Sequence, residues 1–133
     1  MFQGSVQAKY VTKPVKLDED STELKIWMDI HQPTKTYVSV YVKFGSSVTD
    51  MDDNVAWTLI DPDSAVNRSN LNQFTGNGVI PNTDNPGEFA EVGFSKSLGA
   101  NTTFSVFAIK VVFESEDTSR VPMIRNFRAI AVV

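Results

Sequence analysis

Strict alternation of apolar and polar residues runs through two neighbouring segments of the chain, and it constrains the fold more than any other feature. The apolar members of the two rows are Leu24, Ile26, Met28 and Ile30, followed by Val38, Val40, Val42 and Phe44. A period of two sends successive side chains to opposite faces of a strand, and branched and aromatic residues favour strands. The pattern therefore predicts two half-buried strands, joined by a hairpin at His31–Thr36.

Further apolar segments bounded by turn residues predict the remaining strands. They cover Ser5–Leu17, Val55–Ile60, Glu88–Phe94, Thr103–Phe113 and Phe127–Val133. Pro14 lacks a backbone N–H, so it confines the first of these strands to a sheet edge or a bulge. The polar stretch Asp61–Asn70 predicts turns rather than regular structure.

The segment Thr103–Phe113 is apolar on both parities, which is typical of a strand that is covered on both faces. We therefore expect it to be central in a sheet. Its odd-numbered residues should lie between the layers of the fold; these are Phe107, Ile109, Val111 and Phe113.

No segment carries an apolar stripe with a period of 3.6 residues, and several short strands separated by turns favour two packed sheets or a closed barrel. We predict an all-β fold, specifically an antiparallel β-sandwich of the jelly-roll kind. With 133 residues the chain is long enough for one domain, residues 1–133, that buries roughly two-thirds of its unfolded surface.

Composition excludes some classes of partner for such a domain. The net charge of −4, from 12 basic and 16 acidic residues, argues against a nucleic-acid surface, which needs many Lys and Arg contacts to phosphate. The longest apolar runs are far shorter than the ~20 residues that cross a membrane, and Met1–Gly4 lacks an export-signal pattern. We expect a soluble protein that binds neither nucleic acid nor membranes.

Residues for catalysis are scarce. The chain has no cysteine and one histidine, His31, which we expect to lie exposed in the predicted hairpin. Gly93–Ser97 lacks the second glycine of a nucleophile elbow, and the acidic groups Asp50–Asp53 and Asp61–Asp63 lack the pattern of a calcium loop. We therefore predict no catalytic residue, no cofactor, no metal site and no enzymatic activity.

Aromatic residues offer the one candidate ligand site. Trp27 has the parity opposite to the aliphatic row of its strand, and Tyr37 and Tyr41 share that offset parity on the next strand. Aromatic faces on a β-sandwich can stack on sugar rings. An exposed row of Trp27, Tyr37 and Tyr41 is therefore a candidate for carbohydrate binding, and packing within the fold is the alternative.

Several segments resemble one known group of proteins. They are Ala8–Leu17, Glu23–Met28, Val38–Lys43, Phe107–Val112 and Val121–Ala131, in which an Ile-Lys strand leads through a Val-Pro turn into an Arg-Ala-Ile-Ala strand. Together they resemble structural proteins of T4-like tailed bacteriophages, notably the cyanophages of marine cyanobacteria. The resemblance runs from Ala8 to Val133, and only Asn67–Asn85 has no counterpart.

The resemblance implies a non-enzymatic structural protein of the virion, associated with the tail or baseplate. Its partners would be other virion proteins and further copies of itself, and its location would be the virion, after synthesis in the infected bacterium. The chain would then be either complete or a module of a larger virion protein. The alternative function is a carbohydrate-binding or receptor-binding module, for instance in a tail fibre.

The closing segment carries two arginines for which we expect polar or charged partners. Pro122 restricts both its own backbone and that of Val121, which predicts a rigid approach to the last strand. Arg125 and Arg128 should then reach polar surface, and the candidate partners are the carboxylates of Glu114, Glu116 and Asp117.

Overall fold

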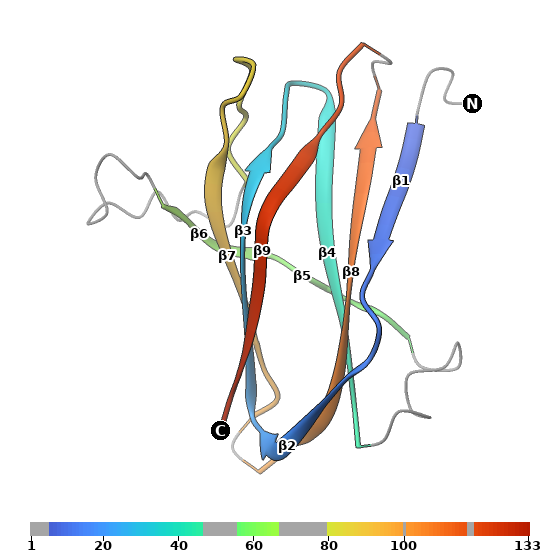
Figure 1. Ribbon diagram of the computed structural model, residues 1–133, viewed down its shortest axis with the longest axis vertical. Coiled ribbons are helices and arrows are strands. Elements are labelled where there is room, and N and C mark those ends of the chain that lie inside the picture. Colours follow the sequence, from blue (N-terminus) through green and yellow to red (C-terminus); the bar gives the residue numbers. More distant parts are fainter. Residues whose placement is uncertain (1–5, 47–55, 67–79, 100, 117–118) are drawn as a thin grey trace.

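The computed structural model describes residues 6–46, 56–66, 80–99, 101–116 and 119–133, and every helix or strand within these ranges is a β-strand (Figure 1). The strands are β1 Val6–Val11, β2 Val15–Ser21, β3 Glu23–His31, β4 Thr36–Gly45, β5 Thr58–Ile60, β6 Pro62–Val66, β7 Ala90–Ser97, β8 Phe104–Ser115 and β9 Met123–Val132. None of the described residues forms a helix that could cross a membrane.

The strands form two antiparallel sheets that pack face to face. Sheet A has the order β1–β8–β4–β5, with β2 also paired to β8, and sheet B has the order β6–β7–β3–β9. In Figure 1 most strands of both sheets run along the long axis of the molecule. The predicted all-β sandwich is thus confirmed at the level of two packed antiparallel sheets.

Strand β8 is the centre of sheet A, as its sequence predicts. It pairs with β4 along one edge and with β1 and then β2 along the other. The chain between β1 and β2 leaves the regular strand at 12–14, where Pro14 lies. The edge position predicted from Pro14 is therefore confirmed.

The core lies between the two sheets and contains the inward-facing rows that the alternation predicts. From sheet B these are Leu24, Ile26, Met28 and Ile30, and from sheet A they are Val38, Val40, Val42, Phe107, Ile109 and Val111, with Phe113 partly buried beside them. Cross-strand register brings like rows together, so that Val40 lies opposite Val111 and Val42 opposite Ile109. Burial of these rows removes apolar surface from water and stabilises the sandwich.

The predicted hairpin at His31–Thr36 is wrong, because the two strands that it joins do not pair. Strand β3 lies in sheet B and β4 in sheet A, so the connection crosses from one sheet to the other. The turn itself is tight, since the Thr36 amide donates to the Pro33 carbonyl over 3.0 Å and Lys35 has a φ of 70°. A turn signal does not specify pairing, and crossing over lets both apolar rows face each other across the core.

The prediction of turns at Asp61–Asn70 is wrong for its first half. Pro62–Val66 forms strand β6, which pairs with β7 at the edge of sheet B, while residues 67–70 lie outside the described residues. Proline is tolerated as the first residue of an edge strand. Only Asp61 separates β6 from β5, and together these strands carry the chain from sheet A to sheet B (Figure 1).

Candidate functional site

The structure separates the three aromatic residues of the candidate ligand row. Trp27 lies on the outer face of sheet B, because its neighbours Ile26 and Met28 fill the core. Tyr37 and Tyr41 lie on the outer face of sheet A. The two outer faces point away from each other across the sandwich. No single groove holds all three rings, and ligand stacking by either set stays a prediction.

On the outer face of sheet A, lysine ammonium groups lie over the aromatic rings. The Lys110 ammonium lies 4.6 Å from the centroid of Tyr41 and 5.0 Å from that of Trp57, which also has the Lys43 ammonium at 4.6 Å. Burial lowers the pKa of Lys110, and the nearby charges of Lys9 and Lys43 lower that pKa further. Because ammonium groups already cover one face of each ring, this surface favours cation–π packing over sugar stacking.

On sheet B, Trp27 lies at the centre of what we call the Trp27 face. Its cross-strand neighbours are Gly93 on β7 and Arg128 on β9. The pyrrole edge of the indole lies over Gly93, where an added Cβ would be 3.4 Å from Trp27 Nε1. That distance is an ordinary van der Waals contact, so the indole packs against the backbone of β7 at Gly93, and a methyl group there would still fit.

An ion pair borders the indole. Arg128 Nη2 donates to Oε2 of Glu91 over 2.9 Å, and the Arg128 guanidinium lies 6.0 Å from the centroid of Trp27. Arg125 pairs instead with Asp29, over 3.5 Å from Nε to Oδ2, and stacks 3.9 Å from the ring centroid of Phe89.

These partners differ from the carboxylates expected near the two arginines. Strand β9 joins sheet B, so its outward arginines meet Asp29 and Glu91 on that sheet, whereas Glu114 belongs to β8 in sheet A. Asp117 lies outside the described residues. The expectation that Arg125 and Arg128 reach polar and charged groups is confirmed, but with other partners.

His31 is buried, which contradicts its expected exposure. It is the last residue of β3, and its Nδ1 lies 2.7 Å from the Glu88 carbonyl oxygen, to which it donates. The Thr83 hydroxyl lies 3.2 Å from the same nitrogen, and the Phe89 ring packs against the imidazole with centroids 5.6 Å apart. These contacts give His31 a structural role, which follows from the crossover between the sheets.

A second candidate site is an apolar groove between β1 of sheet A and β9 of sheet B, which we call the edge groove. It has a volume of about 490 Å³, and a smaller hollow of about 120 Å³ adjoins it. Its lining is mainly aromatic and aliphatic, and includes Ala8, Tyr10, Phe113, Val121, Ile124 and Phe127.

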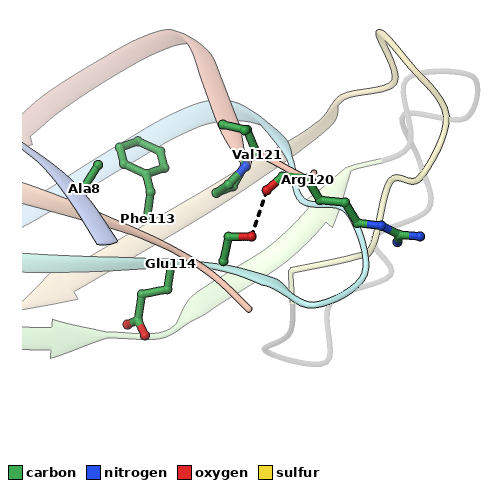
Figure 2. A pocket seen from close by; sticks show the side chains of 7 residues that line it. Ala8, Phe113, Glu114, Arg120 and Val121 are labelled. Atoms are coloured by element: carbon green, nitrogen blue, oxygen red, sulfur yellow. Dashed lines mark hydrogen bonds between the residues drawn. The ribbon is translucent and has the colours of Figure 1, made fainter. Parts of the chain in front are cut away.

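The two edge strands approach each other across this groove. The rings of Tyr10 and Phe127 meet edge to face with centroids 6.1 Å apart. Figure 2 shows Ala8, Phe113 and Val121 around the smaller hollow, with the side chains of Glu114 and Arg120 extending away from Phe113. The dashed line in Figure 2 is the hydrogen bond from the Ser115 hydroxyl to the Arg120 carbonyl, 2.8 Å long, which fixes the chain beside the hollow.

The remaining sequence candidates do not form a site in the described part of the chain. Gly93–Ser97 lies within strand β7, which does not provide the turn that a nucleophile elbow needs. Among the described residues, no three His, Asp or Glu side chains are grouped to hold a metal ion. Asp50–Asp53 lies outside those residues.

Sequence reasoning missed the neighbours of Trp27, because strand register brings Glu91, Gly93 and Arg128 to it from distant parts of the chain. A glycine inside a strand pattern was the one available signal, since it often marks a close approach. Comparisons with known protein families, with curated proteins and with solved structures find no match for this chain. The resemblance to phage structural proteins therefore stays a prediction.

Proposed function

We propose that this protein is a non-enzymatic structural component of a tailed-phage particle, associated with the tail or baseplate, and that it acts through protein–protein contacts. The observation that carries the proposal is the edge groove, a large apolar hollow at the open side of the sandwich. The sequence resemblance to phage structural proteins supports the same role. We also propose a jelly-roll-like topology for the sandwich. The support for it is that β8, from late in the chain, returns to lie between β1 and β4 in sheet A.

The groove suits an extended segment of a neighbouring virion protein. Within the described residues, β1 pairs only with β8 and β9 only with β3, so each strand presents one unpaired backbone edge. An incoming strand can hydrogen-bond to such an edge while its alternate side chains enter an apolar groove. We therefore propose a strand-like segment with apolar residues at every second position as the occupant.

Exposed apolar side chains extend the groove onto the surface. Val121, which precedes β9, is 63% exposed, and Met123, the first residue of β9, is 45% exposed; both line the groove. Large apolar side chains grouped at one place on a surface are typical of interaction sites. A partner strand would bury them together with Tyr10, which is 50% exposed.

Mass spectrometry of purified particles, from a phage that encodes this sequence, tests the location. We expect the protein in intact particles at a fixed copy number, and its absence would defeat the proposal. A photo-crosslinking residue in place of Tyr10 should then capture a virion protein, whereas the same residue in place of Tyr37, on the outer face of sheet A, should not.

Charge substitution tests the groove itself. Val121→Glu and Met123→Glu should reduce incorporation into particles without unfolding the isolated protein, because both side chains are exposed. Leu59→Glu is the matched control, since Leu59 is 55% exposed but lies on β5, at the other end of the strand order of sheet A. Normal incorporation of both groove variants would rule out the groove as the contact.

A further inference from the structure

We propose that the Trp27 face is a binding site for a neutral oligosaccharide. This activity goes beyond the assembly function and does not depend on it. The site lies on the outer face of sheet B, whereas the edge groove opens between the sheets.

The indole of Trp27 supplies the platform. It is partly exposed on a central strand, and its pyrrole edge packs against the backbone of β7 at Gly93. Ile130, on the neighbouring strand β9, is 54% exposed and lies opposite Lys25 in the next cross-strand row. An aromatic ring with further apolar surface on an open sheet face suits the C–H faces of successive sugar rings.

Polar groups surround this platform in the adjacent rows. Ser95 and Lys25 pair across the strands on one side of Trp27, and Glu91 lies on the other side, opposite Asp29, whose carboxylate is buried. With Arg128 beside the ring, Ser95, Lys25 and Glu91 place donors and acceptors around it. Sugar hydroxyls both donate and accept hydrogen bonds, so such a mixed border can recognise them.

Charge pairing indicates a neutral ligand. Arg128 is paired with Glu91 over 2.9 Å, and Lys25 lies 3.9 Å from Glu23. Charges of both signs therefore alternate around the ring, and no charge of one sign dominates this face to attract an ionic ligand. On sheet A, by contrast, the charges beside the rings are the ammonium groups of Lys43 and Lys110.

The site is an open face rather than a pocket, and this determines how the affinity should depend on the length of the ligand. A single sugar ring would bury little surface on it, so binding should strengthen with the number of sugar units. We expect weak binding by monosaccharides and measurable binding by linear oligosaccharides of several units.

Fluorescence titration can detect this binding directly. In a Trp57→Phe background Trp27 is the only tryptophan, so its emission reports on this face alone. Neutral linear oligosaccharides, selected by a glycan-array screen with the full chain, should shift that emission with saturation. No saturable binding to any neutral glycan on the array, up to about 10 mM oligosaccharide, would overturn the proposal.

Substitutions assign the binding to the site. With calorimetry as the readout, Trp27→Ala should weaken binding by about tenfold or more, while Trp27→Phe should retain part of it. Gly93→Leu should also weaken binding, because its side chain would displace the indole, and Tyr41→Ala is the control on sheet A. Circular dichroism establishes that each variant is folded. Unchanged binding by folded Trp27→Ala, or binding lost only in Tyr41→Ala, would overturn the assignment.

Discussion

The side-chain amide of Asn126 donates a 2.7 Å hydrogen bond to Oδ2 of Asp29 and so joins an irregular point on β9 to a buried carboxylate on β3. Asn126 has a φ of 54°, in the left-handed region that asparagine tolerates better than most residues. The β3–β9 register shifts at the same place, between Trp27 and Asp29. Asp29 therefore holds the bulge that turns Phe127 toward the core and leaves Arg128 beside Trp27.

Removing this carboxylate should destabilise the fold. Asp29→Ala breaks the hydrogen bond from Asn126 and the contact with Arg125, and hydrogen bonds to charged groups contribute about 1.5–3 kcal/mol. We expect a loss of roughly 2–3 kcal/mol in the free energy of unfolding, measured by urea denaturation. Arg125→Ala is the matched control and should cost under about 1 kcal/mol, because Arg125 is half exposed. Equal losses for the two variants would contradict this account.

The core of sheet A gives a second stability prediction. Phe107 is buried between the sheets and meets Phe104 edge to face with centroids 6.3 Å apart. Phe107→Ala should cost about 3–5 kcal/mol through lost burial and the cavity left behind. Val112→Ala, on the outer face of the same strand, should cost clearly less in the same denaturant measurement. A loss under about 1 kcal/mol for Phe107→Ala would mean that this side chain does not support the core.

The alternation of side chains made the core predictable, because parity alone decides which residues share a face of a strand. Ile26 and Met28 point into the core and Trp27 points outward, as the pattern predicts. Pairing was not predictable in the same way. Nothing near Pro33 distinguishes a hairpin from a crossover, because that choice depends on which distant strands, β7 and β8, occupy the neighbouring positions.

The candidate sites show the same limit. Sequence parity placed Trp27, Tyr37 and Tyr41 on outward faces, but it could not tell that these faces belong to different sheets. Three of the polar residues around Trp27, namely Glu91, Ser95 and Arg128, come from β7 and β9, which are far away in the sequence. The edge groove likewise depends on β1 and β9 meeting at one side of the sandwich, which is a property of topology rather than of local pattern.

Low pH should weaken the attachment of the segment around Asp84 to the turn that contains Thr34. The backbone N–H and the hydroxyl of Thr34 donate to the carboxylate of Asp84, and these hydrogen bonds, with a smaller contribution from Arg120, lower the pKa of Asp84 below 3.8. A carboxylate whose pKa is lower in the folded state adds stability above its unfolded pKa, and this stability is lost as the pH falls through the folded pKa.

Thermal unfolding as a function of pH tests this contribution. The melting temperature of Asp84→Asn should lie below that of the unmodified protein above about pH 4, and the two should converge at lower pH. In a Thr34→Ala background, which lacks the hydroxyl donor, the difference in melting temperature between the protein with Asp84 and its Asp84→Asn variant should be smaller. A constant difference between the unmodified protein and Asp84→Asn at every pH would show that the carboxylate charge does not contribute.

Gln32 at the crossover between the sheets should be as sensitive as a core residue. It is buried, its Oε1 accepts from the Val38 amide over 2.8 Å, and its Nε2 donates to the Ile80 carbonyl over 3.3 Å. Gln32→Leu keeps a similar volume but leaves both backbone groups without this partner, and each unsatisfied buried group costs about 1–3 kcal/mol. We expect a loss of about 2–4 kcal/mol in urea denaturation. Hydrogen exchange should locate the change, with faster exchange at the Val38 amide. The Ser39 amide serves as the control, because successive N–H groups of a strand alternate in direction and that of Ser39 faces β8, where Ser39 lies opposite Val112. Slow exchange at Val38 in this variant would show that another group satisfies that amide and that the Gln32 side chain does not hold the crossover.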